Sequence, residues 1–264
     1  LYACDLKSLD KDAMGRFFPY ADIKQIINNM KKTEDVSYNN EFLYPKGGAG
    51  SFIDILYNNL DKNRILLNTC ITSIDYDNKI VTTSTNAQYK FEYLINTAPL
   101  NHFLKLFNNP DFNKLEKSLS YNKVLVFNLG FNKKSKFTKE HWIYVPSKNC
   151  NYYRIGFYDN ILDSDKLSMY IEIGYSKDEN IDIDKQLNLT LHNLKVQGII
   201  DDSFKLEEYV SIVMDPAYVH INTSTEQEIS RLKQDLRINN IYTIGRYGAW
   251  TYCSMEDCML EAKN

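Results

Sequence analysis

The sequence lacks the features that mark several classes of protein. Its five cysteines are odd in number and scattered, and none forms a C-x-x-C pair, so it predicts neither a disulfide framework nor a zinc site. No apolar run approaches the roughly 20 residues that span a bilayer, and no basic segment followed by an apolar stretch indicates a signal peptide. Lys and Arg number 31 against 34 Asp and Glu, for a net charge of -3, and this lack of basic excess argues against nucleic-acid binding. We therefore expect a cytoplasmic protein with reduced thiols, no membrane span and no nucleic-acid partner.

The familiar catalytic signatures are missing as well. The four histidines form no H-E-x-x-H pattern and no G-x-S-x-G occurs, so a hydrolase has little support. Neither G-x-x-x-x-G-K-[ST] nor G-x-G-x-x-G is present. The sequence therefore predicts no metal site, and it does not itself contain the first turn of a dinucleotide-binding domain.

What is present is typical of a packed globular chain of 264 residues, with 44% hydrophobic and 25% charged residues. Apolar residues recur about every 3.6 residues in some segments and every second residue in others. The first period predicts helices over 22–30, 51–60, 101–120, 183–200, 226–236 and 255–263. The second predicts strands over 65–69, 71–76, 79–83, 89–97, 124–131, 141–145, 153–158, 169–175, 207–213 and 241–244. This order indicates a mixed α+β fold, in which the strands between 141 and 175 form an antiparallel sheet.

The densest turn signal in the chain is Pro45–Gly50, which leads into a helix with Ser51 as its expected N-cap. A glycine-rich loop at a helix N-terminus leaves backbone N–H groups that, with the helix dipole, bind an anion. A tight turn before a structural helix would give the same pattern, so both interpretations stay open.

Two arginines stand in settings that suit an anionic ligand. Arg246 lies between two glycines, in the block 245–248, where a strand runs into a helix; its fork of donors matches a diphosphate. Arg154 follows two tyrosines in a strand without other positive charge. On a sheet face it could hold an anion, but it could equally pair with Asp159 or Glu172.

Five separated blocks carry a further signal. They are LYACDL (1–6), SYNNEFLYPKGG (37–48), LINTAPL (94–100), WIYVP with YYR (142–146 and 152–154) and GRYGAWTY (245–252). Together and in this order they resemble the UDP-galactopyranose mutases, which are flavoproteins of the amine oxidase and protoporphyrinogen oxidase superfamily. The resemblance covers essentially the whole chain.

The resemblance implies an FAD cofactor and a UDP-sugar substrate, whose pyranose and furanose forms are interconverted for cell-surface polysaccharide biosynthesis. It implies that N5 of the flavin carries the chemistry and that no side chain is itself catalytic. Substrate contacts would come from Arg154, Arg246, Tyr218, Tyr252 and Asn39. Cofactor contacts would come from Gly47, Gly48, Gly245, Gly248, Trp250, Glu256 and Asp257.

The resemblance also implies a domain plan. An antiparallel-sheet substrate domain would occupy residues 101–235, and 45–100 and 236–264 would return to an FAD-binding α/β domain. Residues 1–44 would end a helical region. The family's Rossmann turn would lie ahead of Leu1, so we expect this chain to hold only part of the flavin site and to need the rest for activity.

Two other interpretations remain open. The chain could belong to another flavin oxidoreductase of the superfamily, such as an amine oxidase or a desaturase, and Glu256 in place of the family's amide favours a different substrate. It could also be a non-catalytic interaction module without a cofactor, which the missing Rossmann turn favours. Only the mutase needs a diphosphate clamp, so binding of a UDP-sugar separates it from another flavin oxidoreductase, and a flavin spectrum tests for a module without cofactor.

Overall fold

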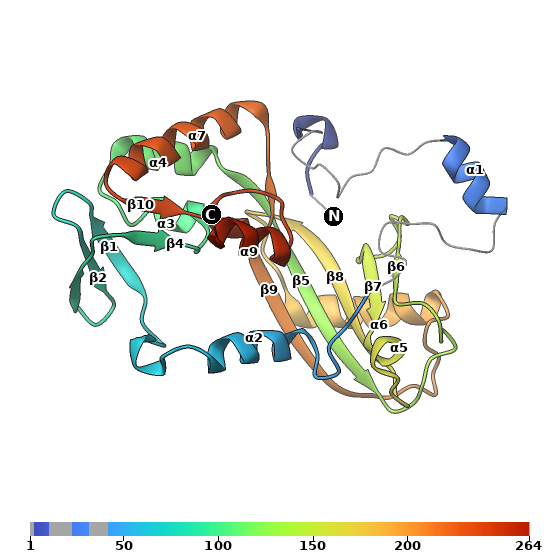
Figure 1. Ribbon diagram of the computed structural model, residues 1–264. Coiled ribbons are helices and arrows are strands. Elements are labelled where there is room, and N and C mark those ends of the chain that lie inside the picture. The colour runs from blue at the N-terminus through green and yellow to red at the C-terminus, as the bar shows by residue number, and fades with distance from the viewer. Residues whose placement is uncertain (1–2, 11–22, 32–41, 264) are drawn as a thin grey trace. The chain divides into compact units, whose positions relative to one another are not determined.

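The computed structural model describes residues 3–10, 23–31 and 42–263, which form helices and mainly antiparallel sheets (Figure 1). The predicted α+β class is confirmed. The chain divides into two compact units, one of residues 14–68 and one of the remaining residues. The domain boundaries expected from the sequence stay predictions. No described helix has the length and apolar content that crossing a bilayer requires.

The described residues of the smaller unit form the helices α1 (Ile23–Lys31) and α2 (Ala49–Asn58) and a 3-10 turn, η3 (Lys62–Arg64). The expectation that Ser51 caps the second helix is wrong. The helix starts two residues earlier, and Gly48 is its N-cap with φ of 80°, a left-handed conformation that glycine adopts without strain. All residues of α2 are exposed or half-buried.

The larger unit is built around a five-stranded antiparallel sheet in the order β6-β7-β8-β5-β9. The strands are β5 (Ser120–Phe131), β6 (Trp142–Tyr144), β7 (Arg154–Phe157), β8 (Ser168–Ser176) and β9 (Leu206–His220). Figure 1 shows helix α6 (Ile183–Val196) lying across this sheet, and Leu187 and Leu194 of α6 join its core. A one-turn helix, α5 (Tyr158–Leu162), follows β7.

A second core lies at the other end of β5 and β9. It is enclosed by the hairpin strands β1 (Ile71–Asp75) and β2 (Ile80–Thr83) and by helices α3 (Leu100–Leu104), α4 (Pro110–Ser118) and α7 (Thr223–Ile238). Strand β3 (Gln88–Lys90) extends the hairpin, while β4 (Leu94–Asn96) and β10 (Ile241–Thr243) form a parallel pair. The chain then enters α8 (Gly245–Gly248) and α9 (Met255–Lys263); the short turn η1 (Leu6–Ser8) lies near the N-terminus.

Several predicted elements need correction. No strand forms over 65–69, where Asn68 adopts a left-handed φ of 54°. The single helix expected over 101–120 is two helices, because Asn109 caps a new helix that starts at Pro110. The strand expected over 89–97 is likewise divided into β3 and β4.

Candidate functional site

The first predicted arginine, Arg154, lies on the large sheet directly opposite Glu172, because β7 and β8 pair in that register. Its Nη2 donates a hydrogen bond to Glu172 Oε1, and its Nη1 donates to the Tyr144 hydroxyl at 3.3 Å. The rings of Tyr144 and Tyr170 lie 5.7 and 5.8 Å from its guanidinium carbon. The pairing with Glu172 that the sequence left open is therefore present.

This ion pair is largely removed from water, with 24% of the Arg154 side chain and 11% of the Glu172 side chain exposed. Burial acts to lower the pKa of Arg154, but the hydrogen bond and charge of Glu172 outweigh it and leave that pKa raised. The second carboxylate oxygen of Glu172 accepts a hydrogen bond from the Tyr153 hydroxyl. Burial, Tyr218 and Glu172 raise the pKa of Tyr153 above its usual range, so this phenol is a neutral donor.

The second predicted arginine, Arg246, lies in α8 among aromatic rings. Its guanidinium carbon is 4.4 Å from the centroid of the Tyr252 ring and 5.7 Å from that of Tyr218. Its Nη1 donates to the carbonyl of Cys253 at 3.1 Å. Within the described part of the chain no carboxylate forms an ion pair with Arg246, and its contacts there are with ring faces and a backbone carbonyl.

The two arginines belong to one continuous group of side chains. Tyr218 and Tyr252 stack with ring centroids 5.9 Å apart and planes 23° apart. Tyr218 also interacts with Tyr153 and Glu172, and burial followed by the Glu172 charge raises its pKa to about 12. We call this group the Arg–Tyr cluster. Its members are Tyr153, Arg154, Glu172, Tyr218, Arg246 and Tyr252.

The structure thus brings together four of the five predicted substrate contacts, namely Arg154, Arg246, Tyr218 and Tyr252. The fifth, Asn39, lies outside the described residues. Sequence reasoning missed Tyr153 as a member of this group, and it missed that Glu172 orients the Tyr153 hydroxyl. The only signal for Tyr153 was its place beside Arg154, and the pairing register that presents Glu172 is not readable from either strand alone.

The glycines of α8 differ in what surrounds them. Gly245 has a φ of 79°, and a Cβ built there would meet no atom within 4 Å. A bound group could therefore approach its backbone closely, although its N–H already donates to Glu261 Oε2 at 2.8 Å. A Cβ on Gly248 would lie 2.8 Å from the carbonyl oxygen of Asn96, so Gly248 serves close packing of α8 on β4 within the chain.

A cavity of about 390 Å³ lies at the carboxyl end of β10 and is lined by Ile244, the residue before Gly245. Parallel strands commonly bind ligands at this end. Its lining includes Thr243, Ile244, Glu261 and Lys233, and burial lowers the pKa of Lys233. An open backbone position beside a cavity with polar and apolar walls fits the edge of a large planar cofactor.

Of the predicted cofactor residues that follow α8, Trp250 and Asp257 have structural partners in this chain. Trp250 is 2% exposed and packs edge-to-face on Tyr121 within the second core. Asp257 accepts hydrogen bonds from the backbone N–H and hydroxyl of Ser254 at 2.7 and 2.8 Å, at the start of α9, and Glu256 is exposed.

In the smaller unit, the predicted Gly47 and Gly48 do stand at a helix N-terminus. Gly48 caps α2 without a side-chain hydrogen bond, and nothing lies within 4 Å of a Cβ built on it. A Cβ on Gly47 would lie 3.1 Å from Ser51 Cβ. The structure therefore shows a turn that leads into a helix N-terminus, and anion binding by this loop stays a prediction.

Comparison with known proteins gives a family and a fold. The sequence profile of the family "flavin containing amine oxidoreductase" matches residues 14–264. A solved structure of reduced UDP-galactopyranose mutase superposes with a TM-score of 0.86 at 18% identity, over 95% of this chain and 57% of that one. A putative protoporphyrinogen oxidase from Exiguobacterium sp. 255-15 superposes with a TM-score of 0.69 at 14% identity, over 86% of this chain and 52% of that one.

A third solved structure is a CLA-producing fatty acid isomerase from P. acnes. It superposes with a TM-score of 0.60 at 14% identity, over 82% of this chain and 50% of that one. The chain thus spans about half the length of the solved proteins that it matches. No curated protein sequence matches it. At these identities the structural likeness establishes the fold alone.

Proposed function

The chain belongs to the family of flavin containing amine oxidoreductases, and from that premise we propose that it forms the diphosphate-binding part of an FAD-dependent, UDP-galactopyranose mutase-like enzyme. Membership of the family implies a flavin cofactor; that the flavin is FAD and that the substrate is a UDP-sugar are part of the proposal. We place the reaction in the cytoplasm, in the supply of furanose sugars for cell-surface polysaccharides.

The observation that carries the proposal is the convergence of two arginines and two stacked tyrosines in one cluster. Glu172 balances the charge of Arg154, so Arg246 supplies the net positive charge of the Arg–Tyr cluster. Arginine donors and neutral phenols match the oxygens of a diphosphate. An amine oxidase would have no use for this arrangement, because its substrate is itself a cation.

The roles of the side chains follow from these contacts. Arg246 binds the diphosphate and the hydroxyls of Tyr218 and Tyr252 donate to it, since burial keeps Tyr218 protonated. Glu172 holds Arg154 and Tyr153 in place. The open backbone at Gly245 would hold the edge of the flavin, which when bound and reduced would supply the nucleophile for the anomeric carbon. The diphosphate is the leaving group, so residues that stabilise its charge also promote its departure.

The test is binding of UDP to the flavin-loaded, reduced protein by titration calorimetry. Arg246→Gln should weaken UDP binding by about 10- to 100-fold, as loss of a charge-assisted contact does. Arg246→Lys keeps the charge and should recover part of the affinity. The matched control is Arg231→Gln, which removes an exposed arginine from α7 and should leave UDP binding unchanged.

An unchanged UDP affinity in Arg246→Gln would refute the proposal. The same experiment separates the other interpretations. A flavin spectrum without UDP binding indicates another oxidoreductase of the superfamily. A chain that retains no flavin on gel filtration either needs residues outside it to complete the flavin site or is a non-catalytic module, and an assay of the full-length protein separates these two.

A further inference from the structure

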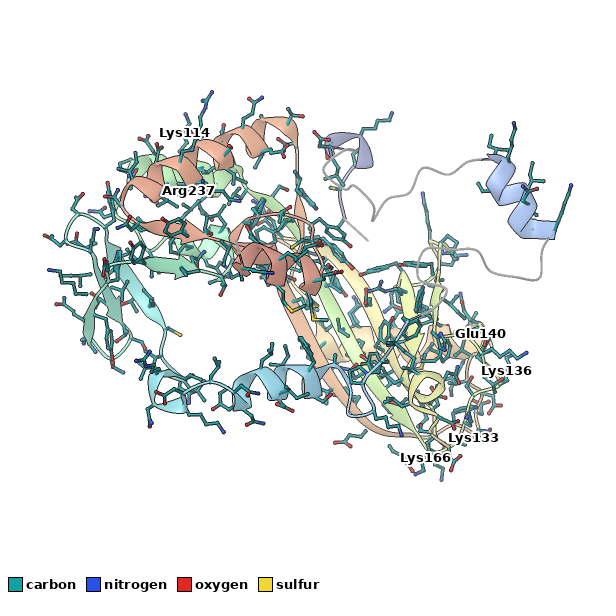
Figure 2. The ribbon with its side chains drawn as sticks, in the orientation of Figure 1. Lys114, Lys133, Lys136, Glu140, Lys166 and Arg237 are labelled. Atoms are coloured by element: carbon teal, nitrogen blue, oxygen red, sulfur yellow. The ribbon has the colours of Figure 1, made fainter. Side chains whose placement is uncertain are left out.

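A second cationic site lies at the end of the large sheet where β5 finishes. The loop after β5 and the turn between α6 and β9 enclose a cavity of about 670 Å³. Its walls carry four lysines, Lys133, Lys134, Lys136 and Lys195. Figure 2 shows Lys133 and Lys136 at this end of the sheet, far from Lys114 on α4.

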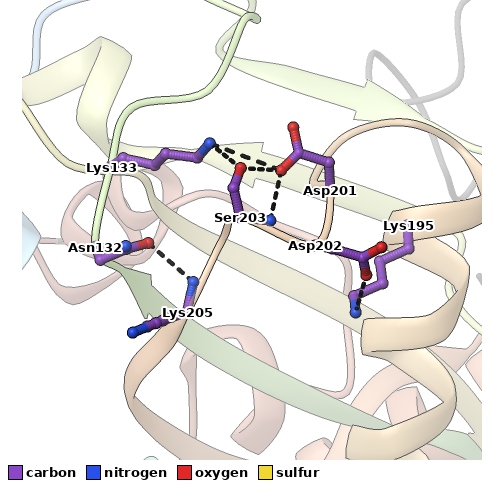
Figure 3. A network of polar contacts seen from close by, with 7 residues as sticks. All are labelled: Asn132, Lys133, Lys195, Asp201, Asp202, Ser203 and Lys205. Carbon is purple, nitrogen blue, oxygen red and sulfur yellow. Dashed lines mark hydrogen bonds and ion pairs between the residues drawn. The ribbon is translucent and has the colours of Figure 1, made fainter.

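Two of the four lysines hold the walls together. Lys133 Nζ lies 3.6 Å from Asp201 Oδ1 and also donates to the Ser203 hydroxyl, and Lys195 Nζ lies 2.9 Å from Asp202 Oδ1 (Figure 3). The two walls are further joined through the backbone N–H of Lys205, which donates to the side-chain oxygen of Asn132 at 2.9 Å. The cavity is therefore a built feature of the sheet end.

The other two lysines are not neutralised in this way. Among the described residues, neither Lys134 nor Lys136 has a carboxylate oxygen within 4 Å. Lys136 Nζ lies 5.5 Å from the Phe137 ring and would lie 3.5 Å from a Cβ on Gly198. Lys134 acts only at a distance on the buried carboxyl of Asp159. Four lysines and two aspartates give the cavity a formal charge of +2 in a chain whose net charge is -3.

We propose that this lysine pocket binds a phosphorylated small molecule that carries at least two negative charges. Lysine ammonium groups bind phosphate as compact point charges. The half-buried ring of Phe204 also lines the pocket, so an apolar or sugar moiety of the ligand has a surface to lie on. The volume falls within the range of small-molecule sites, about 300–1,000 Å³.

The lysine pocket is separate from the Arg–Tyr cluster. Glu172 of that cluster pairs with Val126 of β5, whereas the pocket begins after Phe131, where β5 ends. Five residues of extended strand correspond to about 17 Å. One diphosphate cannot span that distance, so the two sites bind their ligands independently.

The probe is inorganic pyrophosphate, titrated into the full chain by calorimetry at constant ionic strength. The test variant is Lys134→Gln/Lys136→Gln, which removes the two charges without breaking the ion pairs of the walls. The matched control is Lys114→Gln/Lys117→Gln, which removes two exposed charges from α4. We expect the dissociation constant of the pocket to rise about tenfold or more in the test variant and less than about twofold in the control.

A titration of the unchanged chain without any binding event outside the Arg–Tyr cluster would overturn the proposal. So would an equal loss of affinity in the test and control variants, because it would show general charge attraction. Arg246→Gln serves as the second comparison, since it should remove the diphosphate site of the cluster and leave the pocket intact. Arg246→Gln therefore tests the proposed function, and Lys134→Gln/Lys136→Gln tests the lysine pocket, so failure of one proposal is distinguishable from failure of the other.

Discussion

At the scale of single residues, the pairing of Arg154 with Glu172 makes each side chain dependent on the other. Arg154→Met should destabilise the protein by about 3 kcal/mol, because it leaves a largely buried carboxylate without its cation. The double variant Arg154→Met/Glu172→Leu should recover most of that loss, since it removes both charges and fills the same space. Urea unfolding of the two variants measures the difference.

Equal stability of the single and double variants would contradict this account of the pair. It would mean that Glu172 finds enough solvent or another donor when Arg154 is absent.

A second prediction at this scale concerns the close packing of Gly248. Gly248→Ala should cost about 1–3 kcal/mol, because its new methyl group would lie 2.8 Å from the Asn96 carbonyl oxygen and neither backbone can move freely. Gly130→Ala in β5 is the control, since its methyl group would meet the Glu208 carbonyl oxygen at an ordinary 3.7 Å. Thermal unfolding should show a clearly lower Tm for Gly248→Ala, and similar Tm values would show that α8 can shift away from β4.

At the scale of elements, strands β8 and β9 carry tyrosines that the fold keeps protonated. Burial raises the pKa of Tyr170 and of Tyr218 to about 12, against about 10 in an unfolded chain. Above pH 10 the unfolded chain releases these protons first, so their contribution to stability is complete below pH 10 and is lost as pH rises towards 12. The urea midpoint should fall across this window.

Tyr218→Phe should make that fall shallower, because one of the protons is no longer linked to folding. Tyr89→Phe, on the exposed strand β3, is the control. An identical pH profile for Tyr218→Phe and the unchanged chain would refute the linkage.

Another prediction concerns strand β9, which lies at one edge of the five-stranded sheet. Its residues Val210 and Ile212 are 53% and 50% exposed, and an apolar outer strand pairs readily with another chain. We expect concentration-dependent self-association in sedimentation experiments, reduced by Ile212→Lys. Ile238→Lys, at an 81% exposed position ending α7, should have little effect, and equal association of both variants would exclude β9 as the contact.

The same elements show how far sequence reasoning reaches. Periodicity located α1 and the antiparallel strands, and neighbouring glycines or tyrosines singled out the two arginines, because each of these signals is a local pattern. The strand expected over 207–213 actually continues to His220. Its pairing with β5 jumps from Met214 to Tyr218, and Pro216 lies in that irregular stretch, so a proline that ordinarily ends a strand is accommodated in a bulge. Glu172 could not be assigned for a related reason, since cross-strand partners depend on a register that only the folded sheet defines.

At the scale of the whole molecule, the two compact units differ in how much they bury. No residue of α2 is buried, whereas Leu125 and Phe127 of β5 are fully buried. Helices of 9 or 10 residues have little stability without tertiary packing. In hydrogen exchange followed by mass spectrometry, amides of α1 and α2 should exchange far faster than those of β5, and comparable protection would show that other contacts stabilise the helices.

One strand serves two cores: Leu125 and Leu129 of β5 belong to the core of the large sheet, while Tyr121 packs against the second. Adding or removing a single codon between Tyr121 and Leu125 would turn every following side chain of β5 to the opposite face of the sheet, so Leu125 and Leu129 would leave their core while Tyr121 keeps its place. Residues 146–149, the exposed part of the loop between β6 and β7, have no such constraint. Among descendants of this gene, we expect length variation to collect in that loop and to be absent from the middle of β5.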